Sequence, residues 1–322
     1  MKSLIGTSID RERPSAFLPL VWSLVLMMLL LPVYPALGEE SSSADCRYEG
    51  IGVVPSGHAD GAPLEAFPEN DVFRPLLADP KQPQFFASWQ ATRIRTDHSA
   101  VNIGSVGFGE NFGLVGRRNG CNGWQVGILA GVFAQFDMDA PSMDLINADY
   151  VIGLPLSWRS GLFSARVRLY HQSSHLGDEF LLGRPNFNRV NLSFEAVEAI
   201  LSLDAPGGWG RVYAGGSSLV HRAPATLDRN GAQWGVELRG PAIAVPMMTR
   251  LRLIPVFGAD FKSFEELQWV INSNVVGGLE WSKAGSDRRF RLLLNYYHGF
   301  VPYGQFFAQK VEMVGAGLYL SF

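Results

Sequence analysis

The sequence predicts an all-β fold, a transmembrane antiparallel β-barrel of about twelve strands. Three features carry this prediction: an N-terminal export signal, a long series of segments in which apolar and polar residues alternate, and a last such segment that ends at Phe322. Alternation with a period of two is the pattern of a strand with one apolar and one polar face. In a transmembrane barrel the apolar face meets lipid and the polar face lines the lumen.

Residues 1–38 predict a secretory signal peptide. Positive charges precede a nearly uninterrupted apolar run over residues 17–32, and the small residues Ala36 and Gly38 occupy the two positions that a signal peptidase recognises. A transmembrane helix needs about 20 apolar residues, and this run is shorter. We therefore expect cleavage near Gly38 rather than an uncleaved anchor.

Residues 39–84 differ in composition from the rest of the chain. They are rich in Ser, Asp, Gly and Pro and show little alternation, so we expect an irregular lead-in on the periplasmic side. The chain holds two cysteines, Cys46 in this lead-in and Cys121 in a predicted turn on the same side. A low, even count in an exported protein favours one disulfide, and we predict a Cys46–Cys121 bridge, with two unpaired thiols as the alternative.

Residues 85–322 are the predicted barrel. Between residues 163 and 170, for example, apolar side chains alternate with polar ones that include Arg166 and Arg168. The spacing of the turn residues divides this part into strands with a period of two. The predicted strands are 85–95, 103–118, 123–138, 145–158, 162–173, 188–203, 209–221, 231–241, 248–262, 267–282, 288–300 and 308–322.

A soluble β-sandwich also alternates and is the main competing fold. The predicted strands are longer than the about 5–6 residues that are usual in soluble proteins. Aromatic residues stand at strand ends, for example Trp124 with Phe136 and Tyr150 with Trp158, as in the girdles of membrane barrels. The polar parity also carries many charges, which a narrow lumen accommodates by pairing them with one another. These charged residues are Arg166, Arg168, Arg189, Glu195, Glu237, Arg239, Arg250, Arg252 and Glu280.

The last segment is the most specific feature of the chain. Phe322 shares one parity with Leu320 and Leu318, and this pattern resembles the C-terminal strand of outer-membrane barrel proteins. The resemblance implies a location in the bacterial outer membrane and recognition of Phe322 by the outer-membrane assembly machinery. With Phe322 on the periplasmic side, counting back along the strands places the longer loops on the outer side. These loops are 139–144, 174–187, 222–230 and 300–307.

Charge excludes one class of partner. The net charge is −3 and the pI is about 6.1, and the sequence has no basic stripe or basic tail. We therefore expect no nucleic-acid partner.

One stretch carries candidate chemistry: His171 and Ser173, together with Asn188. His171 and Ser173 continue the apolar parity of their strand, so they are predicted to face lipid near its outer end. Asn188 opens the next predicted strand, and its parity continues through Leu192 and Phe194, which are also predicted to face lipid. Adjacent antiparallel strands bring such residues within about 5 Å. The three side chains are therefore expected to meet on the outside of the barrel.

These residue types suit an esterase. A serine is a weak nucleophile until an imidazole takes its proton, and a third group must orient that imidazole. Residues 169–191 resemble outer-membrane phospholipase A, whose motif has His-Gln-Ser on one strand and an aromatic-Asn-Arg run at the start of the next. The resemblance implies that Ser173 is the nucleophile, His171 the general base and Asn188 the orienting residue.

The same resemblance raises calcium as a candidate cofactor. The calcium ligands of that family have no clear counterpart in this sequence. Asp178 and Glu179 are the nearby acids whose oxygens suit a hard cation. Two acids in a loop are more often simply solvated.

The mature sequence as a whole, including residues 73–85 and 170–180, is similar to a family of bacterial proteins of unknown function, which implies no reaction. Two functions stay open. One is a hydrolase that acts on the acyl esters of phospholipid or lipid A. The other is a non-enzymatic barrel, either a narrow channel or a structural surface protein. Membrane lipids are the expected partners, and a homodimer is a candidate assembly.

Overall fold

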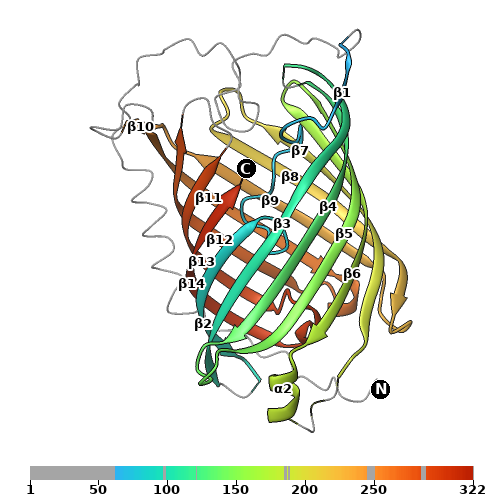
Figure 1. The fold of residues 1–322 in the computed structure, drawn as a ribbon, viewed down its shortest axis with the longest axis vertical. Helices are drawn as coiled ribbons and strands as arrows, with labels where there is room; N and C mark the ends of the chain where they lie inside the picture. Colours follow the sequence, from blue (N-terminus) through green and yellow to red (C-terminus); the bar gives the residue numbers. More distant parts are fainter. Residues whose placement is uncertain are drawn as a thin grey trace. The chain divides into compact units, whose positions relative to one another are not determined.

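The described residues form a closed antiparallel β-barrel (Figure 1). Within these residues twelve strands make the wall, and the predicted all-β fold and strand count are confirmed. No helix in this part of the chain is long and apolar enough to cross a membrane. The computed structural model describes residues 62–96, 99–120, 122–184, 187, 189–244, 251–283 and 288–321.

The strands lie close to the predicted spans, and most ends agree within a few residues. The barrel strands are β2 (Phe85–Ile94), β3 (Ala100–Asn119), β4 (Asn122–Asp137), β5 (Asp144–Ser160), β6 (Phe163–Leu176), β7 (Leu192–Asp204), β8 (Gly210–Ala223), β9 (Asn230–Arg239), β11 (Leu251–Phe264), β12 (Ile271–Lys283), β13 (Arg289–Phe300) and β14 (Lys310–Ser321). The short elements are β1 (Leu64–Ala66), α2 (Asp178–Gly183), β10 (Ile243–Ala244), η2 (Glu265–Leu267) and η3 (Gly304–Phe306).

The barrel closes between its last and first strands. Each long strand pairs with the next one along the chain, and β14 returns to β2, where Leu318 lies opposite Ala87. The short strands β1 and β10 pair with β3 and β11 respectively. Closure satisfies the backbone groups that an open sheet edge would expose to lipid.

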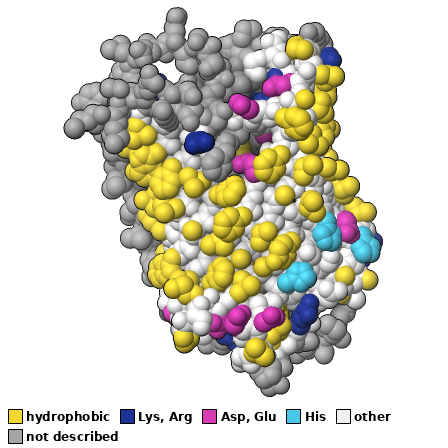
Figure 2. Space-filling view, in the orientation of Figure 1, with side chains coloured by type: hydrophobic (Ala, Val, Ile, Leu, Met, Phe, Trp, Pro, Cys, Tyr) yellow, Lys and Arg dark blue, Asp and Glu magenta, His cyan; other side chains and the backbone are white. Residues whose placement is uncertain are grey.

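The two faces of the wall differ as the alternation predicts. On β6 the apolar side chains Phe163, Val167 and Leu169 are exposed, whereas Arg166 and Arg168 are buried on the lumen side. Apolar side chains cover much of the outer wall (Figure 2). The lumen charges pair with one another: the carboxylate of Glu198 accepts hydrogen bonds from Arg166 at 3.2 Å and from Arg168 at 2.7 Å.

The predicted facing of β7 is wrong. The strand begins at Leu192 rather than at residue 188, and Leu192 is buried on the lumen side with Phe194 beside it in the wall of a cavity. Glu195, predicted to line the lumen, lies on the outer face. The physical reason is that the lumen wall is itself partly apolar here: the ring centroid of Tyr170 lies 6.2 Å from that of Phe194. An apolar side chain on this strand therefore does not mark the lipid side. Arg189 precedes the strand and is exposed.

A segment of the chain also enters the lumen. Residues 71–84, here called the plug, dip into the lumen from the end of the barrel at which β14 finishes (Figure 1). Phe73 is 1% exposed, and its ring lies against the guanidinium groups of Arg166 and Arg211 at 4.9 and 4.6 Å. Leu76 packs with Phe73 in the same cluster.

Ion pairs also hold the plug to the wall. Arg74 pairs with Asp204 near one end of the barrel. Deeper in the lumen, Nζ of Lys262 lies 2.6 Å from the Asp79 carboxylate. Nζ of Lys81 lies 2.5 Å from the carboxylate of Asp149. The plug therefore crosses the lumen, and each of these charges has a partner. Apolar plug residues also pack against the wall: Leu77 and Ala78 cluster with Ile254, Val256, Val276 and Leu293.

Residues 62–84 of the predicted lead-in are irregular apart from β1. Most of this segment, the plug at residues 71–84, lies in the lumen. The signal peptide predicted for residues 1–38 lies outside the described residues. The same holds for the rest of the lead-in before residue 62, for Cys46 and Cys121, and for Phe322.

Candidate functional site

The outer wall carries the first candidate site. His171 and Ser173 lie two residues apart on β6, and both belong to its outward parity. Across the β6–β7 pair, His171 lies opposite Glu195, and Ser173 lies opposite Ser193. The direction that the alternation predicts for His171 and Ser173 is the direction that the structure has.

Glu195 joins two histidines. Nδ1 of His171 lies 2.8 Å from Oε1 of Glu195, and Nδ1 of His221 lies 2.8 Å from Oε2 of the same carboxylate. The side chains of His171 and Glu195 are 40% and 39% exposed, and that of His221 is 80% exposed. The three groups therefore form a row across β6, β7 and β8, here called the His-Glu-His row.

A β-bulge brings His221 into this row. Along β8 the outward residues run at every second position and include Val212 and Val220. By that parity His221 would face the lumen. The pairing of β7 with β8 shifts between Glu195 and Ala196, which adds one residue to β8 and places His221 opposite Glu195. A bulge that re-aims a side chain is a recurrent device near functional sites.

The surroundings of the row are apolar. Ile152 lies opposite His171, and Leu169 and Val197 flank the row on the same face, all three exposed. Figure 2 shows histidine side chains on both sides of an acidic one at this part of the outer wall. Ionisable groups on a membrane-facing surface are costly, so their presence points to a function.

The geometry of the predicted triad is incomplete. Within the described residues His171 hydrogen-bonds Glu195 through Nδ1, and no hydrogen bond joins it to Ser173. Because Nδ1 is engaged, Nε2 is the nitrogen left for the serine hydroxyl. Asn188 lies outside the described residues. Glu195 was missed as a site residue because the alternation assigned it to the lumen.

The two candidate cation ligands lie on a short helix. Asp178 and Glu179 lie in the first turn of α2 and are exposed. In the described part of the chain, no group of three or more His, Cys, Asp or Glu is arranged to hold a metal ion. Two exposed carboxylates are fewer than the about 6–8 oxygen ligands that calcium takes, and calcium binding by Asp178 and Glu179 stays a prediction.

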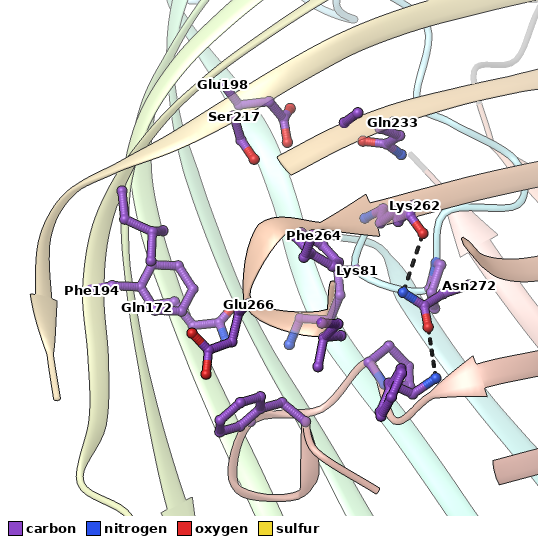
Figure 3. A pocket seen from close by; sticks show the side chains of 18 of the residues that line it. Lys81, Gln172, Phe194, Glu198, Ser217, Gln233, Lys262, Phe264, Glu266 and Asn272 are labelled. Carbon is purple, nitrogen blue, oxygen red and sulfur yellow. Dashed lines mark hydrogen bonds between the residues drawn. The ribbon is translucent and has the colours of Figure 1, made fainter. Parts of the chain in front are cut away.

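The lumen holds a second candidate site that sequence reasoning missed. A cavity of about 220 Å³ lies between the tip of the plug and the loops at the α2 end (Figure 3). Its walls include Gln172 and Phe194, and Lys81 lines it from the plug. Gln172 lies between His171 and Ser173 on β6 and faces the lumen, whereas its two neighbours face outward.

The sequence matches one known protein family. A family model described as "Protein of unknown function (DUF1207)" matches residues 47–322. The comparison with curated proteins found no match.

Among solved structures, outer membrane phospholipase A from Escherichia coli is similar, with a TM-score of 0.51 at 12% identity. The match covers 76% of this chain and 93% of that one. The β domain of the Bordetella autotransporter Brka has a TM-score of 0.39 at 14% identity and is covered to 98%, against 74% of this chain. At 12% identity the likeness to the phospholipase structure establishes the fold alone, which is that of a bacterial outer-membrane β-barrel. Because the family model spans most of the sequence, the chain belongs to the DUF1207 family.

Proposed function

We propose that this outer-membrane barrel hydrolyses acyl esters of membrane lipids at its outer wall. The observation that carries the proposal is the 2.8 Å contact between His171 Nδ1 and the Glu195 carboxylate, with Ser173 on the same face two residues along β6. A carboxylate on Nδ1 holds the imidazole in the tautomer that leaves Nε2 free to accept a proton, which a catalytic base requires.

The proposed chemistry uses these three groups in sequence. Oγ of Ser173 attacks the ester carbonyl carbon while Nε2 of His171 takes the hydroxyl proton. Glu195 stabilises the imidazolium that forms. The imidazolium then returns its proton to the departing alcohol, and a water molecule activated by the same imidazole hydrolyses the acyl-enzyme. A substrate embedded in the outer leaflet would need a site that faces lipid, as this one does.

The roles of Glu195 and Asn188 are separable. Asn188 was predicted to orient His171, by resemblance to outer-membrane phospholipase A. Glu195 already engages Nδ1, so the proposal gives the orienting role to Glu195. Activity that survives Asn188→Ala but not Glu195→Gln would support this assignment, and the reverse result would return the role to Asn188. No step in the proposal uses calcium.

The test measures fatty-acid release from phosphatidylethanolamine vesicles by the purified, refolded barrel. We expect Ser173→Ala to lower the rate by at least about 10³-fold and Glu195→Gln by about 10²–10⁴-fold, by analogy with other triads. Ser193→Ala is the matched control, because Ser193 lies opposite Ser173 on the same outer face. Equal rates for the wild type and Ser173→Ala would end the catalytic proposal.

A further inference from the structure

The cavity in the lumen has a definite position and boundary. The plug supplies its floor through Pro80 and Lys81, and strands from β5 to β13 supply its walls. Residues around η2 and η3 line it toward the α2 end. Its volume of about 220 Å³ far exceeds the about 10–15 Å³ needed by one water molecule. It can therefore hold a small organic ligand.

The buried basic groups around the cavity already have carboxylate partners. Among the described lining residues four are basic and four are acidic. Deep in the cavity, Arg168 pairs with Glu198 at 2.7 Å, and Lys262 pairs with Asp79 at 2.6 Å. The buried basic lining residues Lys81, Arg168 and Lys262 each have a carboxylate partner, which disfavours an anionic ligand. The carboxylate of Asp260 accepts hydrogen bonds from Tyr213 and Gln233. The eight charged lining residues are Lys81, Arg168, Arg229, Lys262, Glu198, Asp228, Asp260 and Glu266.

Neutral polar groups remain for a ligand. Gln172 is only 8% exposed, and its amide side chain lines the cavity. Gln233 donates from Nε2 to Asp260 at 2.7 Å, and its carbonyl oxygen has no partner among the described residues. Ser217 adds a hydroxyl from β8. Figure 3 shows these side chains around the cavity, together with Glu198 and Lys262.

Aromatic rings complete the lining. Phe194 and Phe264 stand at the wall in Figure 3, and Phe300, Phe307, Tyr170 and Tyr297 line other parts of the cavity. Flat rings pack against apolar C–H faces, while amides and hydroxyls hydrogen-bond to hydroxyl groups. A wholly apolar ligand would offer no hydrogen bond to the amide of Gln172, which is unfavourable in a site shielded from water. The lining therefore suits a compact, uncharged molecule with many hydroxyl groups and apolar C–H faces.

We propose that this cavity binds a neutral saccharide. The site is distinct from the outer-wall row, because Gln172 faces the lumen while His171 and Ser173 face outward. Saccharide binding in the cavity does not depend on hydrolase activity at the outer wall.

The test is isothermal titration calorimetry of the full-length protein in lipid nanodiscs, which avoids detergents with sugar head groups. The probes are glucose, galactose, N-acetylglucosamine and maltose, with glucose 6-phosphate and glucosamine as charged counterparts. We expect at least one neutral sugar to bind with a millimolar or lower Kd and to bind more tightly than its charged counterpart. Absence of binding by all four neutral sugars at millimolar concentrations would overturn the proposal, as would preference for a charged one.

Two variants locate the binding. Gln172→Leu removes the buried amide, Phe264→Ala removes a ring from another strand, and each is expected to weaken sugar binding at least tenfold. Ser173→Ala is the matched control and is expected to leave sugar affinity unchanged, since it alters the next residue on the opposite face. Unchanged affinity in both cavity variants would contradict the assignment. Loss of lipid hydrolysis with retained sugar binding, or the reverse, separates the two proposals.

Discussion

At the scale of single residues, the environment of each carboxylate in this barrel is defined by the basic groups that it pairs with. Glu195 and Glu198 lie three positions apart on β7 and face opposite sides of the wall. Glu198 is buried between two arginines in the lumen, whereas Glu195 is partly exposed between two histidines outside. The alternation of residue types does not separate them, because both carboxylates interrupt apolar neighbours.

Asp79 shows the same rule inside the plug. Burial alone disfavours its charged form, but Lys262 provides a nearby positive charge and a hydrogen bond. The second effect prevails and lowers the pKa of Asp79 from 3.8 to about 2. A carboxyl whose pKa is lower in the folded state contributes stability that is present above its unfolded pKa. That contribution is lost as the pH falls through about 2.

We predict that Asp79→Asn lowers the free energy of unfolding by about 3 kcal/mol at pH 7, because it leaves Lys262 buried without its closest partner. The difference from the wild type should stay constant between pH 7 and 5 and shrink as the pH approaches 2. Denaturant unfolding in lipid vesicles measures both values. Glu65→Gln, an exposed change on β1, is the control and should have almost no effect. A difference that grows on acidification would contradict the proposed ion pair.

At the scale of elements, the plug is an integral part of the barrel core. Phe73 lies between guanidinium groups and packs with Ile200 and Tyr213 of the wall, so it joins the plug to β7 and β8. A segment held by such contacts and by three ion pairs behaves as part of the folded unit rather than as a loose tail.

We predict that Phe73→Ala lowers the free energy of unfolding by about 3–5 kcal/mol, the usual cost of truncating a buried phenylalanine. Phe67→Ala removes the same ring six residues earlier, where the side chain is 75% exposed, and should cost less than about 0.5 kcal/mol. Urea unfolding of both variants in vesicles gives the comparison. Similar effects for the two would mean that the plug does not pack in the lumen as described.

At the scale of the whole molecule, closure gives the barrel two distinct ends. The short turn at residues 205–209 lies at the end where β14 finishes, and α2 with the loop at residues 138–143 lies at the other end (Figure 1). If the C-terminal end is periplasmic, as the terminal-strand resemblance implies, the cavity lies toward the outer side and the plug enters from the periplasm.

This orientation predicts how cysteine variants react in intact cells. Met143→Cys should react with a membrane-impermeant maleimide without permeabilisation, because Met143 is exposed in a loop at the α2 end. Pro206→Cys, exposed in the turn at the opposite end, should react only after the outer membrane is opened. Both variants are made in a background without Cys46 and Cys121. The opposite labelling pattern would invert the assigned orientation.

Much of this architecture could be predicted from the sequence. The period-two alternation from residue 85 onward specifies twelve strands, their approximate ends and the outward direction of His171 and Ser173, since alternation is a local property of the backbone. The amino-acid composition likewise indicates that residues 62–84 are irregular.

Three features depended on contacts between residues far apart in the sequence. Apolar side chains of the wall, such as Tyr170 beside Phe194, make part of the lumen apolar, so the alternation misplaced Leu192, Phe194 and Glu195. The bulge on β8 turned His221 outward, and a bulge is an irregularity that strict alternation cannot signal. The cavity around Gln172 is bounded by Pro80 and Lys81 of the plug, which lie far from β6 in the sequence. Local sequence determined which residues form strands, and the tertiary structure decided what each strand faces, because the content of the lumen comes from a different part of the chain.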